Sequence, residues 1–125
     1  MNRSHFLLLA GILAAFFGIT MLVSPQQMLA NMAHDAPEGR LVLQWMGVVL
    51  FSVGCINVVA RKDPGSIALR AVMLGNIILH VLGFGIDVYH HSLGFVQISG
   101  VIMGGVVHGV LAAGFVYYLT KLPKR

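Results

Sequence analysis

The amino-acid sequence predicts an all-α membrane protein, a bundle of four transmembrane helices, and three observations support that prediction. The chain of 125 residues is 58% hydrophobic and only 10% charged, with a mean hydropathy of +0.87. Soluble domains carry roughly 25% charged residues, so this supply is too small for a water-exposed surface. Four apolar runs approach the length of about 20 residues that crosses a hydrocarbon core. Finally, basic residues gather in alternate connections between those runs.

The charge pattern predicts the orientation of the chain. Seven of the eight Lys and Arg residues lie in segments predicted to face the cytoplasm, namely Arg3, Arg61, Lys62, Arg70, Lys121, Lys124 and Arg125. Arg40 alone falls in the opposite connections, which hold three of the four acids, Asp35, Glu38 and Asp87. This asymmetry predicts a bacterial inner-membrane protein with both termini in the cytoplasm. The formal charge of +4 then indicates contact with the anionic lipid leaflet, and no nucleic-acid partner is expected.

The predicted spans are residues 6–23, 41–60, 67–86 and 95–119, and they form a single domain over residues 1–125. The first span resembles a signal peptide because Arg3 precedes its apolar core. Its apolar run of about 18 residues is longer than the usual 7–15, which favours a retained span.

The connections are short and contain turn signals. Residues 26–34 can form an interfacial helix, since Pro25 precedes them and Pro37 follows. Residues 61–66 end one helix and form a turn, and Ser66 is expected to cap the third span.

Small residues recur every fourth position in two of the spans. They form Gly100-x-x-x-Gly104 and Gly105-x-x-x-Gly109-x-x-x-Ala113 in the last span and Ala10-x-x-x-Ala14-x-x-x-Gly18 in the first. Such residues let helix backbones approach in lipid. Packing within one bundle is favoured over a dimer seam, and a homo-oligomer or a larger membrane complex stays open.

Polar residues inside the spans are the candidates for a functional site. In the third span, Asn76, His80, Gly83 and Asp87 follow at spacings of four, three and four, and so do Gln97, Val101, Gly104 and His108 in the fourth. Each set shares one helical face. Since polar groups are costly in lipid, both faces should point into the bundle.

We expect these faces to form a polar funnel that opens to the outside and serves as a ligand or proton site. Its candidate residues are Asn76, His80, Asp87, Gln97, His108 and, from the second span, Gln44. Estimated depth pairs Asn76 with His108, and places Gln44, Gln97 and Asp87 near His80. The alternative is that buried Asn and His only join helices by hydrogen bonds.

A second group of side chains suggests a metal site outside the membrane. Its members are Met28, Met32, His34, His90 and His91. Thioether and imidazole ligands suit Cu(I). The alternative is that Met28 and Met32, four residues apart, form the buried stripe of an interfacial helix.

Several classes of activity lack the residues that they need. The single Cys55 provides neither a disulfide nor a CxxC motif, and no Ser–His–Asp set, phosphate loop or HExxH motif is present. No catalytic residues are therefore assigned, and the sequence requires no cofactor. A single b-type haem held by His80 and His108 stays open.

The third span also carries a pattern that resembles a known grouping. It reads RxxxxxGNxxxHxxGxxxD and comprises Arg70, Gly75, Asn76, His80, Gly83 and Asp87. With the short charged start and the basic tail, it resembles small four-helix bacterial inner-membrane proteins of the DoxX-like grouping, largely of uncharacterised function. The resemblance implies a four-helix membrane bundle and brings no catalytic residues.

We therefore expect a small membrane binding or accessory protein. Its interior would hold a hydrophobic small molecule, a quinone or a lipid, or dock a partner membrane subunit, because an apolar cavity with few polar groups suits such ligands. One alternative is a proton-coupled or ion-conducting transporter that uses His80, His108 and Asp87. The other is an electron carrier with one b-type haem.

Overall fold

A computed structural model describes residues 1–32 and 37–123 of the chain, and every long regular element in these residues is an α-helix. The helices are α1 (Arg3–Val23), α2 (Pro25–Met32), α3 (Pro37–Ala60), α4 (Ile67–Ser92) and α5 (Ile98–Thr120). Four of them, all except α2, are long and apolar enough to cross a membrane. The all-helical fold class is thus confirmed.

The helices differ from the predicted spans mainly at their ends. α3 begins at Pro37, before the predicted start at residue 41, and α5 begins at Ile98 instead of residue 95. α4 continues past residue 86 to Ser92, so it carries His90 and His91 as well. The predicted short helix within residues 26–34 is present as α2.

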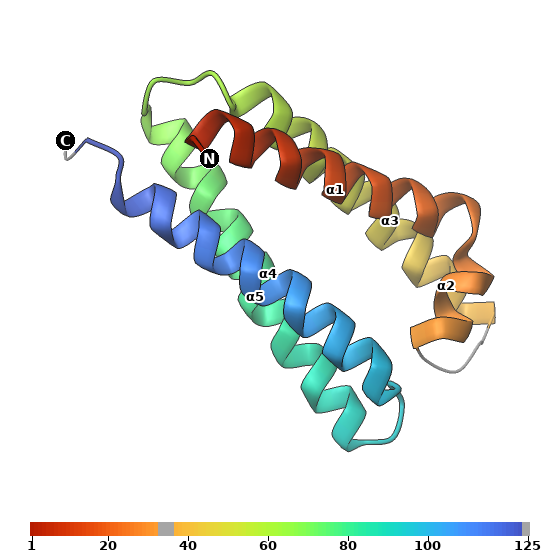
Figure 1. The fold of residues 1–125 in the computed structure, drawn as a ribbon. Helices are drawn as coiled ribbons and strands as arrows, with labels where there is room; N and C mark the ends of the chain where they lie inside the picture. Colours follow the sequence, from red (N-terminus) through yellow and green to blue (C-terminus); the bar gives the residue numbers. More distant parts are fainter. Residues whose placement is uncertain (33–36, 124–125) are drawn as a thin grey trace.

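The four long helices form two hairpins, α1 with α3 and α4 with α5. Figure 1 shows that the hairpins meet near the two termini and the turn between α3 and α4, and diverge toward α2. We call these the narrow end and the wide end. At the wide end, α2 contacts α5 as well as its own hairpin. The two hairpins are therefore arranged as a wedge.

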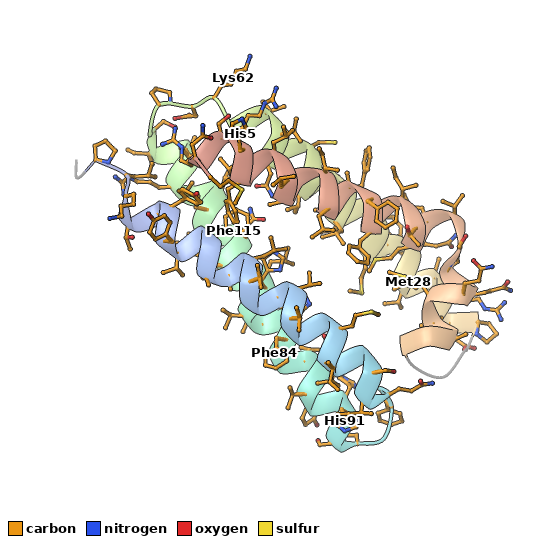
Figure 2. The ribbon with its side chains drawn as sticks, in the orientation of Figure 1. His5, Met28, Lys62, Phe84, His91 and Phe115 are labelled. Carbon is orange, nitrogen blue, oxygen red and sulfur yellow. The ribbon has the colours of Figure 1, made fainter. Side chains whose placement is uncertain are left out.

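A hydrophobic cluster joins the hairpins at the narrow end. Its buried members are Phe6, Leu7 and Ala10 of α1, Leu69 and Met73 of α4, Phe115 of α5, and Leu122. The Phe6 and Phe115 rings meet edge to face with centroids 4.9 Å apart, a favourable aromatic geometry. Figure 2 labels Phe115 at this junction.

The turn between α3 and α4 is held by the Asp63 carboxylate. Asp63 Oδ1 accepts hydrogen bonds of 2.7 Å from the backbone N–H groups of Gly65 and Ser66, and Oδ2 accepts one of 2.6 Å from Ser66 Oγ. These bonds lower the pKa of Asp63 to about 2, and the bond from the Ser66 hydroxyl has the largest effect. Ser66 Oγ in turn accepts from Leu69 N at 3.1 Å, which confirms Ser66 as the N-cap of α4.

Further hydrogen bonds tie the chain ends to this turn. Arg3 donates to the carbonyl oxygen of Asp63, and Arg70 donates to that of Pro123. The Tyr118 hydroxyl donates to Met1 O at 2.5 Å. Each bond joins segments far apart in the sequence, so the narrow end is the tied end of the wedge.

In the α1–α3 hairpin, the backbones of the two helices come into close contact at four glycines. A Cβ at Gly18 would lie 2.6 Å from Phe51 N, and one at Gly54 would lie 2.7 Å from Gly11 O. Likewise, a Cβ at Gly47 would lie 2.8 Å from the carbonyl oxygen of Gly18. The sequence analysis singled out only Gly18. The signal that it missed is a pair of glycines seven residues apart on both helices, which places them on one face.

The small residues of α5 lie in two different environments, one packed against α4 and one exposed. A Cβ at Gly104 would meet Asp87 Oδ2 at 2.7 Å, and one at Gly105 would meet Phe84 Cε2 at 2.8 Å. Both glycines thus pack within the α4–α5 hairpin. A Cβ at Gly109 would meet nothing within 4 Å, and Ala113 is exposed.

Candidate functional site

The two histidines of the candidate site touch each other. His80 of α4 is only 7% exposed, and its Nδ1 lies 2.9 Å from Nδ1 of the half-buried His108 of α5. A neutral imidazole has one donor and one acceptor nitrogen. The contact therefore requires one ring to carry its proton on Nδ1 and the other to accept there.

Asp87 extends this pair toward the wide end. Its Oδ2 lies 3.9 Å from His108 Nε2. That separation is too long for a hydrogen bond, but the carboxylate still acts on the imidazole through its charge. Asp87, His108 and His80 thus form a row of ionisable side chains within the α4–α5 hairpin, which we call the His–His–Asp row.

Two glycines provide the space for the His–His–Asp row. The Cβ position of Gly104 lies 2.7 Å from Asp87 Oδ2, and that of Gly83 lies 3.2 Å from His108 Cε1. A side chain at either position would push against the row. Gly83 and Gly104, which belong to the two polar faces predicted from the sequence, therefore leave room for His108 and Asp87.

A cavity of about 190 Å³ lies between the hairpins, and the two histidines contribute to its wall. The rest of the wall is apolar or glycine: Leu13, Ala14, Phe17 and Met21 of α1, Met28 of α2, Leu50 of α3, and Gly100, Met103, Gly104, Val107 and Leu111 of α5. Figure 2 labels Met28 near the wide end. The cavity is below the roughly 300–1,000 Å³ of pockets that enclose drug-sized ligands. It suits a small head group.

In the part of the chain that the structure describes, both imidazoles of this wall have an Nε2 without a hydrogen bond: that of His108 lies 3.9 Å from Asp87 Oδ2, and that of His80 forms no ion pair. His80 Nδ1 is bonded to His108, but Nε2 has no hydrogen-bond partner among the described residues. In residues 1–32 and 37–123, the one side-chain nitrogen or oxygen that is fully buried and has no hydrogen-bond partner is Arg3 Nε. His80 Nε2 is not in that class. This nitrogen is therefore unpartnered within the described residues and not completely buried.

Asn76 does not pair with His108 as expected. Asn76 and Asn57 of α3 exchange two hydrogen bonds of 3.0 Å, and Asn76 Nδ2 also donates to Val72 O at 2.8 Å. The estimate of depth failed because α4 meets α3 toward the narrow end, where Asn57 lies. The two carboxamides are buried and satisfy each other, so they join the hairpins and leave the cavity wall to the histidines.

Gln44 and Gln97 do not join the histidines. Gln44 Nε2 donates to Leu22 O at 3.1 Å, at the end of α1. Gln97 is exposed at the N-cap position of α5, where its side chain makes no capping bond. The expected neighbourhood of His80 is therefore wrong for both glutamines, because each lies at a helix end while His80 lies inside the hairpin.

The structure describes three of the five candidate copper ligands with their side chains: Met28, His90 and His91. His34 lies outside the described residues, as does the side chain of Met32. His91 Nδ1 is bonded to Val96 O at 2.8 Å, and His90 packs against Tyr89 with ring centroids 5.4 Å apart. In residues 1–32 and 37–123 no group of three or more His, Cys, Asp or Glu side chains is arranged to hold a metal ion.

Comparison of the chain with known protein families, curated proteins and solved structures finds no match. The resemblance to the DoxX-like grouping thus rests on the architecture and the third-span pattern. Within that pattern, Asn76, His80 and Asp87 all face other helices, whereas a Cβ at Gly75 would meet nothing within 4 Å.

Proposed function

We propose that this chain is a multi-pass bacterial inner-membrane protein that binds a small amphiphile, a quinone or a lipid, between its two hairpins. The observation behind the proposal is the apolar cavity with His80 and His108 in its wall. Sites for hydrophobic small molecules combine a mostly apolar lining with a few polar groups that orient the ligand.

Insertion in a membrane is supported by the surface of the long helices. Large apolar side chains such as Leu74, Ile78, Val106 and Val110 are exposed, which is costly in water and favourable in lipid. The narrow end carries Arg3, Arg61, Lys62, Arg70 and Lys121, and Figure 2 labels Lys62 there. This charge supports a cytoplasmic narrow end and two cytoplasmic termini.

The orientation is tested by reporter fusions at the two ends of the chain. Both fusions should report the cytoplasm. An outside signal at either end, or cleavage of the chain before Leu41, would contradict the four-span topology.

The ligand would place its head group against the histidines and its tail between the diverging hairpins. A cavity of about 190 Å³ encloses a ring or a glycerol-sized group but no long chain. The imidazoles offer the head group hydrogen bonds that the remaining wall does not. A bound tail would cover apolar side chains such as Phe17 and Met103 on opposite hairpins.

Binding is tested with decylubiquinol, the reduced form of a short-chain quinone, and detergent-purified protein by isothermal titration without oxygen. His80→Phe keeps a ring of similar size but removes both nitrogens, and Ala14→Phe fills the cavity from the opposite hairpin. Both variants should lose binding, whereas His5→Phe, at an exposed position of α1, should keep it. Equal affinity in all three variants would contradict this site. A partner subunit docked in the wedge would instead make Ala14→Phe disrupt a complex and leave decylubiquinol unbound.

A proton-coupled transporter is the second candidate, and the His–His–Asp row favours it. Beyond His80, however, the path toward the narrow end is filled by Met73, Phe115 and the rest of the apolar cluster. We therefore rank transport below binding. Proton flux into proteoliposomes that disappears in His108→Ala would reverse this order.

A haem carrier ranks third because the two imidazoles are in direct contact. Metal–imidazole bonds are about 2 Å long, so an axial pair holds its nitrogens about 4 Å apart. The Nδ1 atoms here are 2.9 Å apart and bonded to each other. A visible absorption spectrum of the purified protein should therefore lack a haem band.

A further inference from the structure

We infer that the ligand of the cavity donates a hydroxyl hydrogen to His80 Nε2, so the site selects amphiphiles that carry an O–H group. The inference rests on the proposed function and specifies the chemistry of the ligand. It follows from the order of Asp87, His108 and His80 and from their separations.

The first step fixes the proton on His108. An ionised carboxylate can only accept hydrogen bonds. Asp87 Oδ2 faces His108 Nε2 at 3.9 Å. At that distance a nitrogen lone pair would be repelled by the negative charge and an N–H would be attracted. In the neutral pair, Asp87 therefore favours the His108 tautomer that carries its proton on Nε2.

The second step passes this preference to His80. With its proton on Nε2, His108 has only a lone pair at Nδ1. The contact of 2.9 Å between the two Nδ1 atoms then requires His80 to be the donor. A neutral His80 with its proton on Nδ1 has only a lone pair at Nε2. Asp87 acts on the ligand through two imidazoles and is a positioning residue.

The third step concerns the cavity. His80 contributes to its wall, and its Nε2 has no partner among the described residues and is not completely buried. An acceptor left unpaired in an apolar site is unfavourable, and an O–H from the ligand removes that cost. A carbonyl or ether oxygen brings another lone pair and cannot bond to this nitrogen. A hydroquinone and a lipid alcohol share the required hydroxyl.

The tautomers can be measured without a ligand. In protein labelled with ¹⁵N at its histidines and held near pH 8, imidazole shifts separate protonated from unprotonated nitrogens. His80 should be protonated at Nδ1 and His108 at Nε2. In Asp87→Asn this order should weaken or reverse, because the charge is gone and a carboxamide can also donate. Glu38→Gln removes an exposed carboxylate from α3 and should change nothing. A proton on His80 Nε2 in the unaltered protein overturns the inference.

Binding is tested with two pairs of probes of matched size. 4-Nonylphenol is compared with 1-fluoro-4-nonylbenzene, and 1-dodecanol with 1-fluorododecane, because fluorine is close to a hydroxyl in size and cannot donate. The hydroxyl member should bind at least about tenfold more tightly, since a site that pairs with an O–H discriminates against an analogue without it. Asp87→Asn should reduce this preference and Glu38→Gln should retain it.

The outcomes separate the two proposals. Preference within the phenol pair alone indicates a hydroquinone-type ligand, and preference within both pairs indicates a lipid alcohol. Equal binding of the hydroxyl and fluoro members overturns the inference and leaves the binding function standing. If neither the four probes nor decylubiquinol bind, the proposed function fails and the inference fails with it.

Discussion

The two hairpins of this protein are packed in different ways. In α1–α3, glycine faces glycine, and backbone atoms of the two helices contact at Gly11, Gly18, Gly47 and Gly54. In α4–α5, the space beside the glycines is filled by side chains, which include Asp87, Phe84 and His108. One hairpin brings backbone atoms of its two helices together at the glycines, and the other places its ionisable groups beside them.

The difference suggests two roles: α1–α3 as a scaffold and α4–α5 as the hairpin that carries the candidate site. Backbone contacts between glycines have no side chains that can adjust, so they fix the distance between α1 and α3. The polar side chains between α4 and α5 are the candidate groups for holding a proton or a ligand. The first hairpin supplies most of the apolar wall opposite the histidines, and the second supplies the histidines.

The largest effect is expected from an added methyl group in the α1–α3 interface. In Gly18→Ala the new Cβ would lie 2.6 Å from backbone atoms of Phe51, so the helices must move apart. Overpacking of this kind costs about 1–3 kcal/mol, which corresponds to a fall of roughly 5 °C in the thermal midpoint in detergent.

Gly109→Ala is the matched control, because its Cβ would meet nothing within 4 Å. This variant should be unchanged or more stable by up to about 1 kcal/mol, since Ala favours a helix over Gly. Equal destabilisation by both substitutions would show that the glycine interface does not hold α1 and α3 together.

The next effect concerns the contact between the hairpins. Asn76→Leu leaves the buried Asn57 carboxamide without its partner and should destabilise the protein by about 1 kcal/mol. The double variant Asn57→Leu/Asn76→Leu leaves no unpaired amide and should recover part of that loss, as measured by thermal unfolding. A double variant as unstable as the sum of the single ones would argue against the reciprocal pair.

A smaller effect is expected at the turn that joins the hairpins. Because the folded protein lowers the pKa of Asp63 from 3.8 to about 2, the ionised carboxylate stabilises the fold above about pH 4. This stabilisation is lost as the pH falls through about 2. Asp63→Asn should lose less stability than the unaltered protein when thermal unfolding is compared at about pH 6 and pH 2. Glu38→Gln should keep the original pH dependence.

The smallest effect on the fold is expected at the site. In His108→Gln an amide replaces the imidazole as a hydrogen-bond partner, so the thermal midpoint should change by less than the equivalent of about 0.6 kcal/mol. Ligand binding should instead weaken about tenfold or more, or lose its dependence on pH, because an amide does not titrate. Binding that remains strong and pH-dependent in this variant would show that His108 is only structural.

The α4–α5 hairpin was the more predictable of the two. The spacing of His80, Gly83, Asp87, Gly104 and His108 placed these residues on two helical stripes that were expected to point into the bundle. Helical periodicity was sufficient here because both stripes belong to consecutive helices that pack along their length. The Ser66 cap was likewise readable, since a cap depends on residues only three positions apart.

Contacts between the two hairpins, and between α3 and the end of α1, were not predictable in the same way. Asn57 and Asn76 were both visible in the sequence, yet their pairing depends on how α3 crosses α4. The same holds for Gln44, whose bond to the end of α1 removes it from the site. Depth along a span gives one coordinate of a side chain, and its partner depends on the rotation and tilt of the helices as well.

By itself the sequence determined that the chain forms four long apolar helices with polar stripes on two of them. Run length, periodicity and turn residues are local properties, and they act before any helix meets another. Only the tertiary structure decided that the helices form a wedge, that α1 and α3 touch through four glycines, and that His80 meets His108 beside an apolar cavity. These features depend on side-chain volume and on the angle between helices, because in a packed interior the available space selects which polar groups meet.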